Sequence, residues 1–222
     1  MGEMKQLAVG DQSVALYEAT STDPAAPGIG LFHPWWGLND DVKAFADRLA
    51  GAGFHVLAPD MFDGGIAETV EEAERLSRSA DDDRCSAVTL ATIDRLLEGP
   101  GASKKLGVVG FSFGAAWAIW SAAQRDQIAA TVVYYGTWVG EILGEASTPV
   151  LGHFAEDDPY EDADTVSEFE KMLRDAARDT TIHIYRGTGH WFAEPSKDAY
   201  RAEPADLAFD RTVEFLRGRL VG

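Results

Sequence analysis

The chain has 222 residues, and its 19 Lys and Arg against 37 Asp and Glu give a formal charge of −18. With 45% hydrophobic and 25% charged residues it has the composition of an ordinary globular protein, which excludes global disorder. The length favours one domain over residues 1–222. A negative field without a basic cluster repels phosphates and anionic bilayers, so we expect neither a nucleic-acid nor a membrane partner.

The cysteine content and the N-terminal sequence indicate the compartment. Cys85 is the only cysteine and forms no intramolecular disulfide framework, which is typical of a reducing environment. Residues 1–6 lack the apolar core of a signal peptide, and no apolar run reaches the roughly 18 residues of a membrane span. We therefore expect a cytoplasmic protein.

Strand and helix patterns alternate along the chain. Two short strands surround Gly10 within residues 4–18. Buried strands are then expected at 28–33, 54–58, 105–111, 129–135, 149–154 and 181–186, and helices after Asn39 up to Gly51, near 67–79, at 84–98, from Ser112 through Ala122, near 163–177 and near 204–219. The alternation predicts an α/β fold with a mainly parallel sheet, helices on both faces and an antiparallel pair at one edge. Ligands bind such sheets at the carboxyl ends of the strands.

Residues 110–114, Gly-Phe-Ser-Phe-Gly, match the G-x-S-x-G motif. The motif lies where a Val-rich strand turns into an Ala-rich helix, the setting in which a strained turn exposes a serine Oγ as a nucleophile. The alternative is an ordinary turn in which Ser112 caps the helix.

A serine nucleophile needs a base and an orienting acid, which in this class of sheet follow it in the order acid, then histidine. Acid candidates occur at Glu156, Asp157 and Asp158, and His190 follows the next strand. A solvated acidic loop and a surface histidine are the alternatives. The sequence has no H-E-x-x-H motif, no Cys/His cluster, no G-x-G-x-x-G and no P-loop motif, so we expect no metal and no NAD or ATP cofactor.

These motifs resemble the dienelactone hydrolase family of α/β-hydrolases over about residues 28–217. The matching segments are 33–39 (HPWWGLN), 58–62 (APDMF), the motif at 110–114, 158–160 (DPY) and 189–192 (GHWF). The resemblance implies that Ser112 is the nucleophile, Asp158 the acid and His190 the base. It also implies an oxyanion hole made by the backbone N–H groups of Trp35 and Phe113. Asp158 is preferred to Asp157 because an aromatic residue follows the family's acid by two positions.

The sequence departs from the best-known members of this family. Ser112 replaces a cysteine nucleophile, and Pro34 replaces a glutamate before the oxyanion residue. Gly64 and Glu194 stand where dienelactone-cleaving members carry arginines for the substrate carboxylate. We therefore do not expect dienelactone itself to be the substrate, and the long-range negative field also disfavours anionic ligands.

The pocket is expected to be apolar and open. We expect His33, Trp36, Trp138 and Trp191, at carboxyl ends of strands, to contact the substrate. We assign Trp117 and Trp120 on the helix after Ser112 to the core. Only 12 residues, 137–148, separate two strands, which leaves no room there for a helical cap domain.

The prediction is thus a serine hydrolase of small or medium carboxylic esters or lactones, acting through an acyl-enzyme. Acyl transfer or C–C hydrolysis by the same triad is one alternative. A non-catalytic binding protein for a small ligand is another, whereas a dehalogenase would require a carboxylate in place of Ser112.

Overall fold

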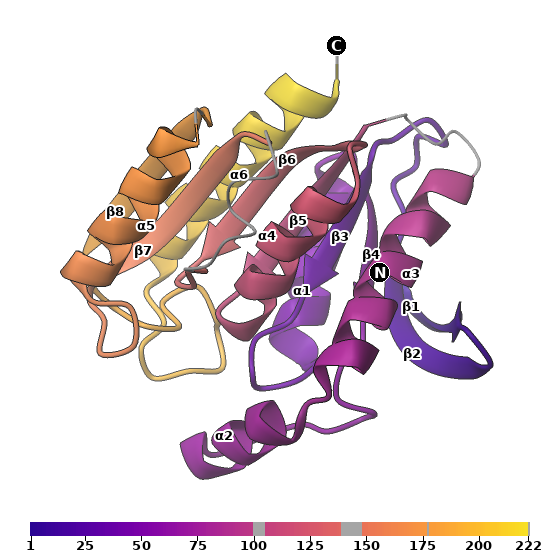
Figure 1. Ribbon diagram of the computed structural model, residues 1–222, viewed down its shortest axis with the longest axis horizontal. Helices are drawn as coiled ribbons and strands as arrows, with labels where there is room; N and C mark the ends of the chain where they lie inside the picture. Colours follow the sequence, from indigo (N-terminus) through magenta and orange to yellow (C-terminus); the bar gives the residue numbers. More distant parts are fainter. Residues whose placement is uncertain (100–104, 139–147, 177, 222) are drawn as a thin grey trace.

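A sheet of eight strands forms the centre of the computed structural model, which describes residues 1–99, 105–138, 148–176 and 178–221 (Figure 1). The strands are β1 (Glu3–Val9), β2 (Gln12–Ala19), β3 (Gly28–Phe32), β4 (His55–Pro59), β5 (Leu106–Phe111), β6 (Ile128–Tyr134), β7 (Val150–Asp157) and β8 (Thr180–Gly189). Their order is β1-β2-β4-β3-β5-β6-β7-β8. β1, β2 and β4 pair antiparallel and all other neighbours pair parallel, which confirms the predicted architecture.

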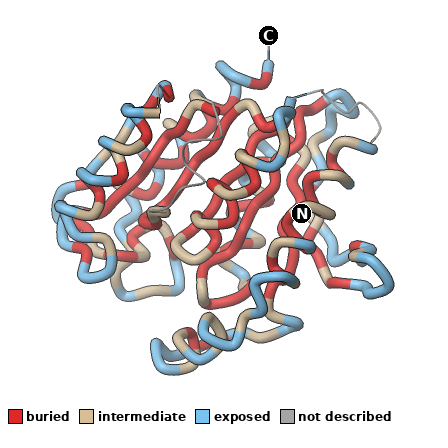
Figure 2. Tube along the Cα trace, in the orientation of Figure 1, coloured by how far each residue is buried: buried red, intermediate tan, exposed pale blue. Residues whose placement is uncertain are grey.

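Helices cover both faces of the sheet. They are α1 (Asp40–Gly51), α2 (Val70–Ser79), α3 (Asp82–Glu98), α4 (Phe113–Gln124), α5 (Ala163–Asp175) and α6 (Ala202–Leu220). α1 and α6 pack on one face, and α3, α4 and α5 pack on the other. α2 projects from this body at the bottom of Figure 1. The central strands are buried along their length (Figure 2), which accounts for their continuous apolar sequences.

Side-chain caps fix where several helices begin. Asn39 accepts a hydrogen bond from the Val42 N–H at the start of α1, and Thr69 and Glu72 form a capping box that starts α2 at Val70 instead of near residue 67. Asp81 caps α3 by accepting from the Arg84 N–H, so this helix begins at Asp82.

β7 and β8 extend beyond their predicted ends. They continue to Asp157 and Gly189, which pair with each other after an irregularity in the register that follows Ala155. The apolar pattern does not report these residues because backbone hydrogen bonds, not side-chain burial, hold them in the sheet. The extension brings the residues after both strands to the same edge.

A buried polar network links three strands to α6. His153 Nδ1 lies 2.8 Å from Tyr185 Oη, and His153 Nε2 lies 3.0 Å from Thr212 Oγ1. Thr212 Oγ1 also lies 2.8 Å from Tyr134 Oη. The network satisfies polar groups that would otherwise be costly to bury. None of the described helices is long and apolar enough to cross a membrane.

Candidate active site

Ser112 occupies a sharp turn between β5 and α4. Its backbone has φ 46° and ψ −113°, a region that residues with a Cβ rarely adopt. Two backbone hydrogen bonds hold the turn: the Ser112 N–H donates to the Tyr134 carbonyl at 2.9 Å, and the Ala115 N–H donates to the Ser112 carbonyl at 2.8 Å. The packing thus supports a strained conformation that a free turn would not keep.

The two glycines of the G-x-S-x-G motif are required by close backbone approach. A Cβ on Gly110 would lie 2.3 Å from the Gly114 carbonyl oxygen, and a Cβ on Gly114 would lie 2.2 Å from the Phe32 carbonyl oxygen. Both distances are far below van der Waals contact. The motif therefore reflects how tightly β5, α4 and the end of β3 approach one another.

The structure brings Ser112, His190 and Asp158 together in one chain of hydrogen bonds. His190 Nε2 lies 3.1 Å from Ser112 Oγ, and His190 Nδ1 lies 2.7 Å from Asp158 Oδ2. Because a carboxylate only accepts, Nδ1 carries the proton toward Asp158, which leaves Nε2 of the neutral ring to accept from the serine hydroxyl. The side chains of His190 and Asp158 are 3% and 1% exposed.

The neighbouring acids lie elsewhere. Asp157 is exposed at the end of β7, and Glu156 accepts a hydrogen bond from the Gly187 N–H. Asp158 Oδ1 accepts from the N–H groups of Tyr160 and Glu161, at 2.9 and 3.1 Å, which fixes the carboxylate while Oδ2 faces His190. The structure thus places Asp158, and not Asp157, against the histidine.

The two backbone groups predicted for an oxyanion hole belong to segments that pack together. Phe113 is the first residue of α4, where an N–H group has no partner within the helix. Trp35 follows the end of β3. The carbonyl groups of Phe32 and His33, just before it, lie close to the backbone of Gly114. The loop with Trp35 is therefore held beside the start of α4.

His33 differs from its predicted contact with substrate. It is fully buried, its Nδ1 lies 2.7 Å from the Pro34 carbonyl, and its Nε2 accepts from the Met61 N–H at 3.0 Å. Burial lowers the pKa of this ring. Both nitrogens are thus occupied, and His33 joins the loop after β3 to the loop after β4.

Two of the predicted substrate-contacting tryptophans pack together beside His190. The Trp36 and Trp191 ring centroids lie 5.1 Å apart, with Trp35 6.0 Å from Trp191. Tyr160 lies 4.9 Å from the His190 ring and 5.4 Å from Trp35. Trp36 is 3% exposed, so it packs behind the neighbouring aromatic side chains and offers little surface to a substrate.

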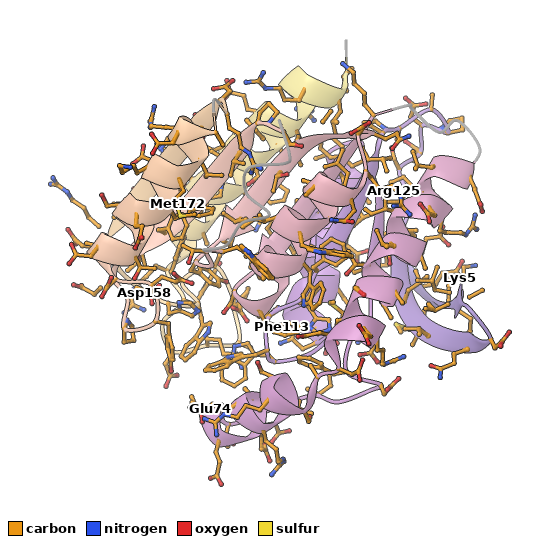
Figure 3. All side chains as sticks on the ribbon, viewed as in Figure 1. Lys5, Glu74, Phe113, Arg125, Asp158 and Met172 are labelled. Carbon is orange, nitrogen blue, oxygen red and sulfur yellow. The ribbon has the colours of Figure 1, made fainter. Side chains whose placement is uncertain are left out.

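A cavity of about 620 Å³ opens beside Ser112, between α3 and α4. Its lining consists of Asp82, Asp83, Ser86, Ser112, Phe113, Ala116, Trp117, Trp120, Thr137, Trp138 and Glu161. Trp138 is among these lining residues. Trp117 is buried in the core and Trp120 packs against it, as expected, and both side chains also line the cavity. Their spacing from Phe113 by four and seven residues places them on one helix face, the signal that could have indicated this. In Figure 3, Phe113 and Asp158 lie at the same lower end of the molecule.

Gly64 and Glu194, at the positions where dienelactone-cleaving family members carry arginines, supply no basic group. The Gly64 N–H donates to Asp60, and Glu194 is 2% exposed, with Oε1 accepting from the Tyr135 hydroxyl. Burial raises the pKa of Glu194 to about 8. Among the described residues, no three His, Cys, Asp or Glu side chains form a group able to hold a metal ion. The short segment expected to lack a cap, 137–148, lies outside the described residues from 139 to 147.

The fold and the serine turn define an α/β-hydrolase. Residues 14–220 match the model of the dienelactone hydrolase family, and the chain belongs to this family of enzymes that hydrolyse esters and lactones. It is 31% identical over 98% of its length to "Protein usf" of Aquifex pyrophilus, and 30% identical over 84% to a Bradyrhizobium sp. protein named "Probable 2-oxo-3-(5-oxofuran-2-ylidene)propanoate lactonase"; the alignments cover 98% and 81% of those proteins.

The solved structures agree on the fold. A dienelactone hydrolase-like promiscuous phosphotriesterase from metagenomic libraries superposes with a TM-score of 0.87 at 21% identity, over 100% of this chain and 99% of that one. Thermogutta terrifontis esterase 2, phosphorylated by paraoxon, superposes with a TM-score of 0.69 at 16% identity, over 98% of this chain and 94% of that one.

Proposed function

We propose that the protein hydrolyses small or medium carboxylic esters or lactones with Ser112 as nucleophile, His190 as base and Asp158 as orienting acid. The observation that carries the proposal is the hydrogen-bonded chain from Ser112 Oγ through His190 to Asp158, at 3.1 and 2.7 Å. A binding protein has no need of this alignment on a strained backbone.

The reaction follows from the geometry. His190 Nε2 takes the Ser112 proton as Oγ attacks the substrate carbonyl carbon, and Asp158 stabilises the imidazolium that forms. The N–H groups of Phe113 and Trp35 bind the oxyanion. His190 then protonates the leaving alcohol, and water, deprotonated by the same ring, hydrolyses the acyl-enzyme. A serine hydroxyl carries no charge at rest, so activation by His190 coincides with the attack.

A fluorophosphonate probe tests the nucleophile. The wild-type protein is expected to be labelled and the Ser112→Ala variant unlabelled, while Ser121→Ala, on the same helix, keeps its labelling. A folded wild-type protein that the probe does not label would overturn the proposal. Added alcohol distinguishes the alternative of acyl transfer, because it would compete with water for the acyl-enzyme.

The state of Cys85 supports a reducing compartment for the enzyme. Cys85 is fully buried, and burial raises the pKa of its thiol to about 11, so it is neither a disulfide partner nor a reactive thiolate. This is typical of a protein kept in a reducing compartment, and we assign the enzyme to the cytoplasm.

A further inference from the structure

The cavity beside Ser112 combines an aromatic wall with three carboxylates, and we propose that it accepts the positively charged group of an ester substrate, such as a quaternary ammonium. The inference rests on the proposed function, because it assigns the substrate class of the same serine. The sequence leads us to expect that anionic substrates are disfavoured, and this proposal adds a preference for cationic over neutral ones.

The aromatic wall comes mainly from α4. Phe113, Trp117 and Trp120 are four and three residues apart and lie on one face of the helix, with Trp138 added from the loop after β6. The Trp117 and Trp120 rings meet edge to face at 5.7 Å. Aromatic faces, those of tryptophan above all, attract a cation within about 6 Å of the ring centroid. A neutral alkyl group gains only the hydrophobic part of such a contact.

Two of the carboxylates face this wall from α3. Asp82 and Asp83 belong to the first turn of that helix, and Ser86, one turn further, continues the same side of the cavity. Neither aspartate forms an ion pair with a described basic side chain. Arg84, the nearest candidate in sequence, bonds instead to Asp63 and to Gln12. Both aspartates are exposed, so their side chains are accessible to a ligand.

The third carboxylate, Glu161, lies closest to the catalytic groups. Its oxygens accept hydrogen bonds from the N–H and the hydroxyl of Thr137, at 3.0 and 2.8 Å, and its own N–H donates to Asp158. Burial raises the pKa of Glu161. A bound cation would offset that desolvation by pairing with the carboxylate.

The charge of the cavity is one-sided. Its described lining residues include three acids and no Lys, Arg or His. The chain as a whole carries −18, so the long-range field has the same sign as the local one. An ammonium group on the substrate would therefore be attracted by the negative field of the protein and, once bound, would contact the aromatic side chains of the cavity.

Three matched thioesters test the proposal: acetylthiocholine, its neutral isostere 3,3-dimethylbutyl thioacetate, and a thioacetate that ends in a carboxylate. At low ionic strength we expect kcat/KM to fall in the order cationic, neutral, anionic, with the cationic ester favoured over the neutral one about tenfold. Salt at about 1 M should reduce this ratio, since screening weakens the contribution of the exposed aspartates.

The double variant Asp82→Asn, Asp83→Asn should lower the ratio of cationic to neutral kcat/KM about threefold to tenfold. Trp120→Leu should lower it as well by removing an aromatic face. The matched control is Asp164→Asn with Glu203→Gln, which makes the same change in net charge at exposed first-turn positions of α5 and α6 and should leave the ratio unchanged.

The outcomes separate the two proposals. If the cationic and neutral thioesters are hydrolysed with equal kcat/KM, the assigned substrate class is overturned while the serine hydrolase stands. The same holds if the control variant lowers the ratio as much as the cavity variant, because the effect would then be one of net charge alone. If no thioester is hydrolysed and the fluorophosphonate does not label Ser112, both proposals fall.

Discussion

The hydroxyl of Tyr135 donates a 2.8 Å hydrogen bond to Glu194 Oε1, beside His190. The ring of Tyr135 lies 4.8 Å from that of His190, so this pair forms part of the surface against which the imidazole packs. Both side chains are buried, and burial raises the pKa of each. Glu194 is therefore predominantly neutral at pH 7, which explains how a glutamate occupies this position beside Tyr135.

Glu194→Gln should change how stability depends on pH. The pKa of Glu194 is raised from 4.5 to about 8, so between these values the unfolded chain loses a proton that the folded protein keeps. The contribution of Glu194 to the stability of the wild type therefore falls as pH rises through this window and levels off above about pH 8. Glutamine does not titrate, so the variant does not lose stability in this way. The free energy of unfolding of the variant minus that of the wild type should increase by about 3 kcal/mol between about pH 5 and pH 8.

Urea unfolding at several pH values measures this difference. Lys197 and Asp41 face Glu194 and are unchanged in both proteins. The exposed variant Glu203→Gln serves as control and should show no such growth. A constant difference between Glu194→Gln and wild type across the range would mean that Glu194 is ionised in the folded protein.

Asp158→Asn should reduce kcat by about 10³-fold to 10⁴-fold at pH 7, because the amide no longer holds the Nδ1–H tautomer of His190. Asp157→Asn, at the exposed neighbouring position, should change kcat by less than about twofold. Steady-state hydrolysis of a neutral aryl ester measures both. Comparable losses in the two variants would contradict the assignment of the acid.

Gly114→Ala should abolish labelling of Ser112 or prevent folding, since the added Cβ would lie 2.2 Å from the Phe32 carbonyl oxygen. Gly218→Ala in α6 provides the comparison, because nothing lies within 4 Å of the position of its Cβ. This variant should be fully active and more stable by up to about 1 kcal/mol. Thermal unfolding and fluorophosphonate labelling check both. An active, normally folded Gly114→Ala protein would show that the turn has more space than the structure gives it.

His153→Gln should make stability less sensitive to acid. Burial holds the pKa of His153 well below 6.5, with His183 and Arg211 adding repulsion. Below about pH 6.5 the unfolded chain binds a proton that the folded protein does not, so wild-type stability falls by up to about 1.4 kcal/mol per pH unit from this site. The variant loses hydrogen bonds to Tyr185 and Thr212, and should be less stable at pH 8, yet decline more slowly below pH 6.5. The free energy of unfolding, measured with denaturant at several pH values, checks this. If it falls equally steeply with decreasing pH in both proteins, His153 is not a neutral buried histidine.

Local patterns in the sequence predicted much of the fold and part of the site. The alternation of apolar strands and helices gave the parallel sheet and its antiparallel edge, because periodicity reports which residues are buried within each element. The G-x-S-x-G motif marked Ser112 for a similar reason: the steric need for glycine at 110 and 114 belongs to one short turn.

Contacts between distant segments were decided only by the tertiary structure. The irregular register between β7 and β8 determines that Asp158 meets His190 while Asp157 faces solvent, and the two paired residues are 32 positions apart. The packing of α3 against α4 places Trp117 and Trp120 beside Asp82 in one cavity. Burial makes His33 a scaffold residue and raises the pKa of Glu194. A sequence pattern reports neighbours within a few residues, whereas charge state, exposure and the pairing of acid with base depend on what the rest of the chain places against each side chain.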